Sequence, residues 1–368
     1  MAFRYLFLLS LIIFGSVHSS EAGTTPAPVA VEPMIWNPPG DQQIKARSVE
    51  TLRSDIRHAQ GSGLIDLGKP PLQAKSEQES GPRQIGFARD IGQLKSKSDT
   101  SSQFNWQPLN GGLVGSFAVQ STGAAALRLG IRVEAIPDLA EVRFFSKDAA
   151  EVQLVSGKEI SETIKRNLDA GDPEDLARMF WSPIISGELA GIEIFLPAGI
   201  SEGSLQISLP QISHLYELPT QSVLQEPKAA SASCELDAMC YPSWSATSKA
   251  VGQMTYISSG SSWSCTGTLL NDKASDGIPY FLTANHCINT QSSASSLSIN
   301  WFYYSSACNS GTLNPTAITS SGGATLLYNS TTTDASFLKL NSAPPTRRYF
   351  CRMVYCKSSN QFSSNRAA

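Results

Sequence analysis

The distribution of cysteine is the feature of this sequence that most constrains its fold. The chain has 368 residues and seven cysteines, and none of the seven precedes position 234. They are Cys234, Cys240, Cys265, Cys287, Cys308, Cys351 and Cys356. In an exported protein this density predicts a disulfide framework over the C-terminal third, and an odd number leaves at least one thiol without a partner in the chain. No Cys-x-x-Cys pair occurs, so the spacing does not favour a zinc site.

The N-terminus predicts export. Arg4 precedes a mostly apolar run over 6–17, which is too short to span a bilayer, and small and polar residues follow around Ser19 and Ala22. We therefore expect a signal peptide over 1–22, the alternative being an uncleaved anchor. A secreted or periplasmic product without stable membrane insertion follows. The formal net charge of −3 argues against a nucleic-acid partner.

Pattern and composition divide residues 23–232 into an arm, a β-rich domain and a linker. From 23 to 109 the sequence is rich in proline and charge, so we expect a mostly extended arm. Over 110–217 apolar residues recur at every second position, which predicts a β-sandwich, with helices around 161–168 and over 174–180. The polar stretch 218–232 predicts an exposed linker that proteases cut.

Residues 233–345 differ sharply in composition. Ser and Thr make up 34 of the 100 residues from 241 to 340, and charge is sparse. Strand patterns lie at 251–258, 264–270, 280–284, 297–304, 324–328 and 335–340. Six short strands separated by turn residues predict a small antiparallel barrel, so the fold class is mostly β throughout.

One histidine stands out by its context. Of His18, His58, His214 and His286, only the last lies in a turn directly after an apolar strand and directly before a cysteine. That turn reads Thr283-Ala284-Asn285-His286-Cys287, and upstream lies the strand Cys265-Thr266-Gly267-Thr268-Leu269. We expect His214, which follows a strand, to have a structural or surface setting.

These two segments resemble the first half of the trypsin-like serine peptidases of chymotrypsin fold. In that family a C-x-G-[ST]-L strand and a T-A-x-H-C turn are joined by a disulfide. The resemblance implies a Cys265–Cys287 bridge and His286 as the catalytic base, with Asn285 where alanine is commonest. An acid must orient the base, and Asp334, before the last predicted strand, is the candidate. The alternative for Asp334 is an ordinary residue of the turn that precedes a strand.

The order of cysteines and aromatic residues over about 234–345 is similar to bacterial lysyl endopeptidase and its relatives. That resemblance implies a Cys240–Cys308 bridge and leaves Cys234 unpaired, because its partner would lie in the distal half. The 110–217 region resembles the long pro-regions of such secreted enzymes. The function implied is a secreted serine endopeptidase precursor that acts on protein or peptide substrates with no metal or organic cofactor.

The nucleophile of that family is missing from the sequence. No Gly-Asp-Ser-Gly-Gly or Gly-Ser-Ser-Gly-[Ser/Thr] loop occurs, and the nearest sequences, at 259–261 and 321–323, precede Asp334 and so lie in the wrong order. We therefore expect the second barrel, with the catalytic serine and the specificity pocket, to be missing and the chain to be inactive.

The tail over 346–368 is basic and unlike the family. A reading frame advanced by one base can read Ala-Gly-Trp directly after Phe350, where the family continues with these residues, so we expect a frameshift near residue 350. The alternative is a genuinely diverged protein. The alternative function is a catalytically dead, exported binding or inhibitory protein.

Overall fold

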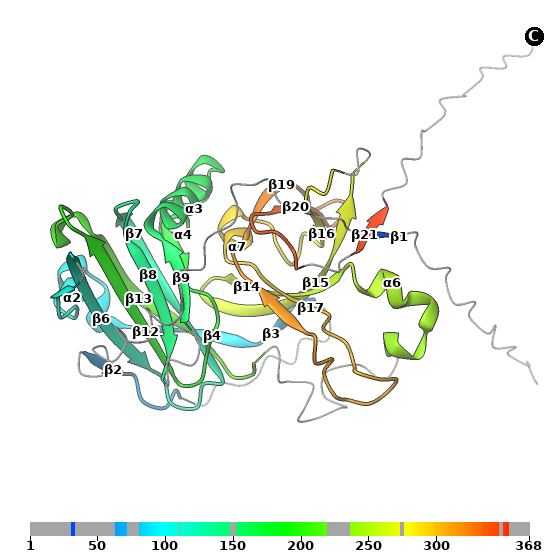
Figure 1. Ribbon diagram of the computed structural model, residues 1–368, viewed down its shortest axis with the longest axis horizontal. Coiled ribbons are helices and arrows are strands. Elements are labelled where there is room, and N and C mark those ends of the chain that lie inside the picture. Colours follow the sequence, from blue (N-terminus) through cyan, green and yellow to red (C-terminus); the bar gives the residue numbers. More distant parts are fainter. Residues whose placement is uncertain are drawn as a thin grey trace, which may run out of the picture.

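The computed structural model describes residues 31–33, 63–71, 81–109, 111–147, 152–218, 236–272, 276–345 and 349–352. The expected signal peptide, nearly all of the expected linker, Cys234 and most of the tail lie outside these residues. Two β-rich bodies lie side by side along the longest axis, the sandwich in cyan and green and the second body in yellow and orange (Figure 1). Within the described ranges, none of the helices is both long and apolar enough to cross a bilayer.

The first body is a sandwich of two sheets. The five-stranded sheet has the order β10-β7-β13-β4, with β11 also paired to β7, and the six-stranded sheet has the order β2-β6-β12-β8-β9, with β5 also paired to β6. The strands of the first sheet are β4 (Gly86–Asp90), β7 (Ala126–Ala135), β10 (Met179–Trp181), β11 (Ile185–Ser186) and β13 (Gln206–Leu215). Those of the second are β2 (Leu64–Asp66), β5 (Gln107–Leu109), β6 (Gly112–Gln120), β8 (Glu141–Ser146), β9 (Val152–Ser156) and β12 (Leu189–Pro197).

Alternation along the strands builds the core of the sandwich. Leu127, Leu129 and Ile131 of β7 point to one side and are buried against residues such as Phe117 and Ile192 from the facing sheet. Because side chains alternate along a strand, the period-two pattern in the sequence becomes one apolar face on each sheet. The predicted sandwich is therefore present as two packed layers.

The boundary expected at residue 110 needs correction. Part of the segment expected to be an extended arm supplies β2, β4, β5 and the helix α2 (Lys97–Ser101) to the sandwich. Phe104 lies in the core, edge-on to Phe117 with ring centroids 4.8 Å apart. These elements are three to five residues long, which is too short for a periodic signal, and the three strands are ordered by pairing with β6 and β13.

Two helices stand over this sandwich. The predicted helix around 161–168 is α3 (Gly157–Asp169), which begins at a capping box formed by Ser156 and Glu159. The helix predicted over 174–180 is wrong at its end, because α4 stops at Ala177 and Phe180 lies in β10. There Phe180 pairs with Ile131 of β7, so sheet pairing overrides the local helical pattern.

The second body contains the strands predicted between 251 and 340, and it confirms the mostly β, chymotrypsin-like class. Its main sheet has the order β18-β17-β14-β15-β16-β20-β19. These strands are β14 (Val251–Ser258), β15 (Ser261–Asn271), β16 (Tyr280–Thr283), β17 (Ser298–Trp301), β18 (Ile318–Ser320), β19 (Ala324–Ser330) and β20 (Ala335–Leu340). The helices are α6 (Ser245–Ser248) and α7 (Gln291–Ser295). Among the residues that the structure describes, the short 3₁₀ turns are Gly92–Leu94, Glu202–Ser204, Ala238–Cys240 and Pro242–Trp244.

Three further strands join this sheet. β21 (Tyr349–Arg352) runs parallel to β15, β1 (Val31–Pro33) is antiparallel to β21, and β3 (Arg83–Gln84) is antiparallel to β15. Figure 1 shows β1 and β21 together on the side of the second body that lies away from the sandwich. The N-terminal part of the chain therefore reaches the second body at two separate places.

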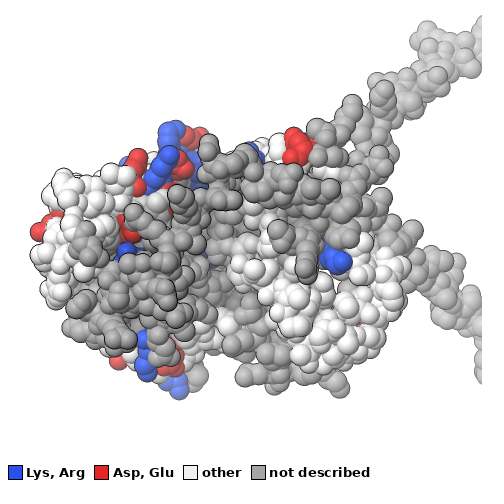
Figure 2. Space-filling model, viewed as in Figure 1, with Lys and Arg blue, Asp and Glu red and all other residues white. Residues whose placement is uncertain are grey.

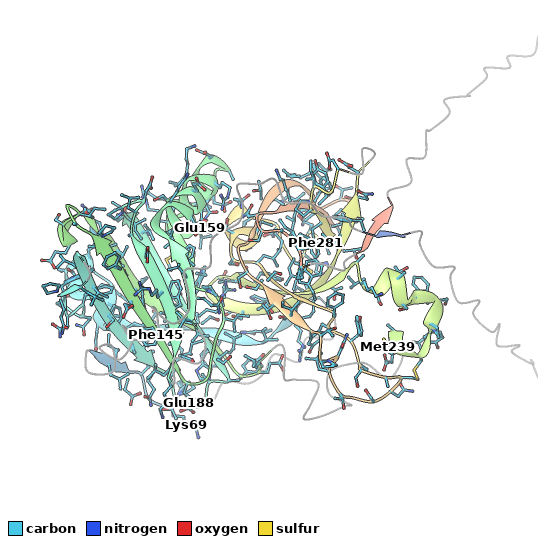
Figure 3. The ribbon with its side chains drawn as sticks, in the orientation of Figure 1. Lys69, Phe145, Glu159, Glu188, Met239 and Phe281 are labelled. Atoms are coloured by element: carbon cyan, nitrogen blue, oxygen red, sulfur yellow. A yellow bond between two sulfur atoms is a disulfide. The ribbon has the colours of Figure 1, made fainter. Side chains whose placement is uncertain are left out.

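The core of the second body is centred on Phe281 (Figure 3), which packs edge-on to the buried Trp301 at 6.0 Å. Gly267 lies under the Phe281 ring, where an added Cβ would come within 2.1 Å of it. Any larger residue at 267 would displace this ring, so glycine is a packing requirement at this position.

The expected barrel is not closed by strand pairing among the described residues, and this part of the prediction is corrected. β18 and β19, the two ends of the sheet order, are joined by the turn at 321–323 rather than by a ladder. Gly322 and Gly323 have φ values of 124° and 69°, and the Gly323 N–H donates to Leu297 O at 3.1 Å. The chain turns sharply here, so the two edges meet at a loop.

Candidate active site

The His286 turn follows directly from β16. Phe281 anchors the strand in the core, and after Thr283 the chain turns, with the N–H groups of Cys287 and Ile288 both donating to Ala284 O at 3.2 Å. A buried strand that ends in a tight turn projects the next side chain outward. The side chain of His286 is accordingly 49% exposed.

A disulfide holds this turn from the other side. Cys287 is joined to Cys265 of β15, with Cα atoms 6.3 Å apart. β15 also pairs with β16, Leu269 opposite Phe281. The turn is therefore held both by the strand ladder and by a covalent bond to the neighbouring strand.

Asp334 meets His286 from the β19–β20 hairpin. It is the last residue of the turn before β20 and has φ 47°, a left-handed conformation that Asp tolerates better than most residues. Its Oδ2 lies 2.7 Å from His286 Nδ1, and its Oδ1 accepts the backbone N–H of His286 at 2.9 Å. Both carboxylate oxygens are thus used on one residue, which fixes the ring and its backbone together.

The electrostatics of the pair follow from these contacts. The hydrogen bond from the His286 backbone, followed by that from the ring, holds the pKa of the Asp334 carboxyl below its usual value. An ionised carboxylate at Nδ1 favours the tautomer in which Nδ1 carries the proton, and Nε2 is then free to accept one. Among the residues that the structure describes, His286 makes its side-chain hydrogen bond with Asp334 alone.

The second disulfide lies at the start of this body. It joins Cys240, in the 3₁₀ turn Ala238–Cys240, to Cys308 in the loop after β17, with Cα atoms 4.5 Å apart. Asp237 supports the same junction by accepting the N–H of Asn309 at 2.8 Å. The expectation that Cys234 is unpaired concerns a residue outside the described part of the chain and stays a prediction.

The two serine-glycine segments considered as sources of a nucleophile lie elsewhere. Ser259 and Gly260 form the hairpin turn between β14 and β15, and Ser321 precedes the turn into β19. Ser321 Oγ is 3.3 Å from Ser298 Oγ. Within the described ranges, neither segment makes a hydrogen bond to His286.

Three potential metal ligands lie in or next to the His286 turn. Ligand atoms of Cys265, His286 and Cys287 lie within 4.8 Å of one another. Both sulfur atoms belong to the disulfide, so in the oxidised protein they are not thiolates and only the imidazole remains as a ligand.

His214 lies inside the sandwich. It is buried on β13, stacks on Phe87 with ring centroids 4.8 Å apart, and its Nδ1 is 2.7 Å from Ser121 Oγ. Burial first and the charge of Arg89 second lower the pKa of His214 from 6.5 to about 4. This histidine is therefore a neutral structural group of the sandwich.

Charge and hollows are unevenly distributed over the described surface. On the face shown in Figure 2, charged side chains gather on the sandwich, while the described surface of the second body is largely uncharged.

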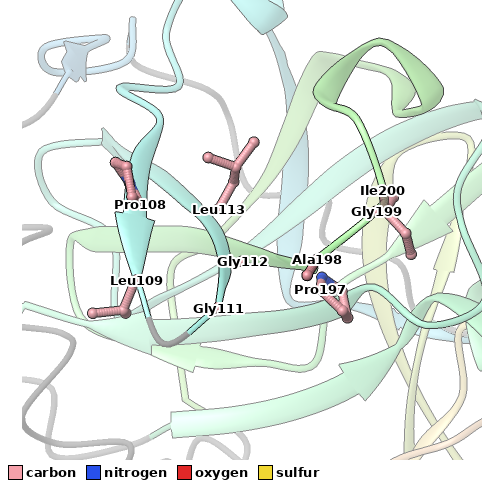
Figure 4. A pocket seen from close by; sticks show the side chains of 9 residues that line it. All are labelled: Pro108, Leu109, Gly111, Gly112, Leu113, Pro197, Ala198, Gly199 and Ile200. Atoms are coloured by element: carbon pink, nitrogen blue, oxygen red, sulfur yellow. The ribbon is translucent and has the colours of Figure 1, made fainter.

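A hollow of about 460 Å³ lies on the sandwich between the β5–β6 turn and the turn at 197–200 (Figure 4). Its lining is proline, glycine, alanine, leucine and isoleucine, which offers no titratable group for chemistry.

Sequence reasoning missed three features of the site. Asp334 accepts hydrogen bonds from both the backbone and the ring of His286, and this needs the left-handed conformation of Asp334. The only local signal for that conformation in the sequence is an Asp that follows three threonines. Asn285 is buried, and its Oδ1 has no hydrogen-bond partner within the described part of the chain. Ser336 Oγ donates to Ile288 O at 2.5 Å and ties β20 to the segment after the turn.

Comparison with known proteins covers both bodies. Residues 65–216 match the family model described as Lysyl endopeptidase N-terminal domain, and residues 228–364 match that described as Lysyl endopeptidase, C-terminal domain. A lysyl endopeptidase of Pseudomonas aeruginosa is 32% identical over 247 residues, which cover 64% of this chain and 50% of that protein. The chain therefore spans about half the length of this curated relative.

Proposed function

The chain belongs to the lysyl endopeptidase family of serine peptidases, and from this premise we propose that it is an exported endopeptidase precursor in which His286 is the general base and Asp334 its orienting acid. The sandwich is the pro-region and the second body is the first half of the peptidase. The observation that carries the proposal is the 2.7 Å contact between His286 Nδ1 and Asp334 Oδ2. The substrates are proteins or peptides, and the product is secreted or periplasmic.

The chemistry follows from the free Nε2 of His286. A serine hydroxyl that attacks the scissile carbonyl gives its proton to Nε2, and the same proton passes to the leaving amine. Asp334 holds the ring in the tautomer that can accept this proton and stabilises the imidazolium that forms. Its carboxylate suits this role because its pKa is lowered and the group stays ionised at neutral pH.

For the 368-residue chain itself we propose that there is no peptidase activity, because its sequence holds no nucleophile loop of this family after Asp334. A base and an acid without a nucleophile cannot perform covalent catalysis by this route. The proposed source of the defect is a frame change after Phe350, beyond which the advanced frame would lead to the serine loop.

The deciding experiment compares the 368-residue chain with the protein that the advanced frame would encode. The gene is read past codon 350 in all three frames, the protein is expressed from the advanced frame, and peptide-bond hydrolysis is the readout. We expect activity from the restored protein and none above background from the 368-residue chain. In the restored protein, His286→Ala should reduce kcat/KM by a factor on the order of 10⁴ or more.

Asp334→Asn in the restored protein tests the acid. We expect a loss on the order of 10⁴ in kcat with little change in KM, because the wrong tautomer is favoured while the geometry is kept. Asp175→Asn removes an exposed carboxylate of helix α4 that makes no contact with the His286–Asp334 hydrogen bonds and is the matched control. Robust, His286-dependent hydrolysis by the 368-residue chain would contradict the proposal.

A catalytically dead binding protein is the second function that an observation supports. The second body has its own core and two disulfides, and no described hydroxyl bonds to His286. A monomeric product that resists degradation would favour this function. Aggregation would favour an incomplete enzyme, because Leu282, Leu327 and Tyr328 are 41%, 46% and 59% exposed, as expected of a face that a missing half would cover.

A further inference from the structure

The sandwich and the peptidase-like body touch through a short serine-rich helix. Figure 1 shows α7 on the side of the second body that faces α3 and α4 of the sandwich. Asp172, in the α3–α4 turn, accepts two hydrogen bonds on Oδ2, from the N–H and the hydroxyl of Ser292, both at 2.6 Å. Asn167 Oδ1 accepts the hydroxyl of Ser295 at 2.7 Å. The sandwich therefore binds two hydroxyls and one backbone N–H of this helix.

Arg128 reaches the same helix from the sheet. It lies on β7, is only 2% exposed, and donates through Nη2 to Ser296 O at 2.8 Å and through Nε to Ser182 O at 2.8 Å. Among the described residues, no carboxylate pairs with it. A buried cation without a counterion is costly unless its donors are used, and Nη1 of Arg128 has no partner among the described residues. The carbonyl of Ser296 is therefore one of the two acceptors that stabilise the buried guanidinium.

The serines of this segment divide into two groups. Ser293 and Ser296 act within the second body, because the N–H of Ser293 donates to Thr290 Oγ1 and the N–H of Ile257 donates to Ser296 Oγ. Ser292 and Ser295, three positions apart and so on one face of the helix, present their hydroxyls to the sandwich. The serine run therefore has a use that catalysis does not require.

Among the described residues, the bodies also meet along β15, where backbone pairing is accompanied by a side-chain contact. β3 adds to the edge of β15, the Ile85 N–H donates to Ser262 O at 2.9 Å, and Ser213 Oγ lies 2.8 Å from Ser262 Oγ. Pairing through backbone groups is tolerant of sequence, because every residue carries the same donor and acceptor. Selectivity must then come from side chains, and both charged groups at α7, Asp172 and Arg128, belong to the sandwich.

We infer that the serine-rich segment 291–296 is the element by which the sandwich recognises the peptidase-like body, with Asp172 and Arg128 as its two charged anchors. The partner that this sandwich surface fits is an uncharged, serine-rich helix and not an acidic or basic one. The two bodies therefore stay bound through this contact when the segment 219–235 that links them in sequence is cut. This inference is independent of whether the chain is an active peptidase.

The test uses the full chain with a site-specific protease sequence inserted between 219 and 235. After cutting, we expect the two parts to co-elute in gel filtration at micromolar concentration. Their dissociation constant is then measured by dilution in an analytical ultracentrifuge. Asp172→Asn and Ser292→Ala should each raise that constant about ten-fold or more, since a charge-assisted hydrogen bond is lost in both.

A double-mutant cycle separates recognition from general damage. If Asp172 acts on Ser292, the double variant should be little weaker than either single variant, whereas independent effects would multiply. Asp175→Asn, an exposed acid on the adjacent helix α4, should leave the constant unchanged. Thermal unfolding of each uncut variant checks that it has folded.

Three results would overturn the inference. The first is separation of the cut wild-type parts at micromolar concentration. The second is a dissociation constant for Asp172→Asn and Ser292→Ala within two-fold of that for Asp175→Asn. The third is multiplicative behaviour in the cycle, which would place the two residues in unrelated roles.

Discussion

The two bodies of this protein are stabilised by different means. The sandwich has no cysteine, and it holds together with a core of large aliphatic and aromatic side chains and with a buried ion pair, Arg143 to Glu193 at 2.5 Å. The peptidase-like body has few charges, two disulfides and many hydroxyl contacts to backbone, such as Thr283 Oγ1 to Thr266 O at 2.9 Å.

This difference shows how each body treats its titratable side chains. The sandwich buries its titratable histidine and makes it a structural group, whereas the peptidase-like body presents His286 and Asp334 half-exposed. An exposed pair gains little positional order from packing, so covalent and backbone restraints must supply it. The disulfide at Cys287 and the backbone bond from His286 to Asp334 are those restraints.

The largest expected effect comes from the disulfides. Replacing Cys240 and Cys308 by serine opens a loop of 68 residues and should lower the free energy of unfolding of the peptidase-like body by about 4 kcal/mol; for Cys265 and Cys287, separated by 22, the loss should be about 3 kcal/mol. Urea unfolding followed by hydrogen exchange of peptides from each body measures this. Equal destabilisation of the sandwich would break the comparison.

Acid should act on the sandwich first. The folded pKa of His214 is about 4 against 6.5 for the free group, so between these values the unfolded chain binds a proton that the folded sandwich does not. Its stability is complete above about pH 6.5 and falls as the pH drops to about 4, by about 3 kcal/mol in all. His214→Gln, which cannot titrate, should flatten this dependence.

The peptidase-like body should respond in a lower window. The pKa of Asp334 is lowered from 3.8, so the stability that its ionised form contributes is present above that value and is lost only as the pH falls below it. Unfolding curves of the two bodies at pH 7, 5 and 3.5 would show the order. A larger decrease in the free energy of unfolding between pH 7 and pH 5 for the peptidase-like body than for the sandwich would contradict both assignments.

The smallest expected effect on stability comes from the N-terminal cap of helix α3, which belongs to the sandwich alone. Ser156→Ala removes the acceptor of the Glu159 N–H at the start of α3 and should cost about 1 kcal/mol in the sandwich alone. Ser161→Ala, inside the same helix, is a control that leaves the capping box intact and removes only a long hydrogen bond, 3.4 Å, to Ile136 O. If the two variants are equally stable, the cap contributes nothing measurable.

Much of the site could be predicted because its signals are local. The apolar strand, the Thr-Ala-Asn-His-Cys turn and the cysteine on the preceding strand pattern all lie within 23 residues, from Cys265 to Cys287. The meeting of His286 with Asp334 bridges a separation of 48 residues, and only the resemblance to a family linked them. The backbone grip of Asp334 could not be predicted, since it depends on a left-handed residue in one hairpin turn.

By itself the sequence determined the strands that carry a period-two pattern, as β14 and β20 show by matching the predicted ranges residue for residue. It also determined that crosslinks are confined to the second body. Only the tertiary structure decided that Phe180 joins a strand, that residues before 110 complete the sandwich, and that the main sheet ends in a loop at 321–323 instead of a closed ladder. The physical reason is range: alternation and capping act between neighbours in sequence, whereas pairing and burial are set by segments that meet only when the chain has folded.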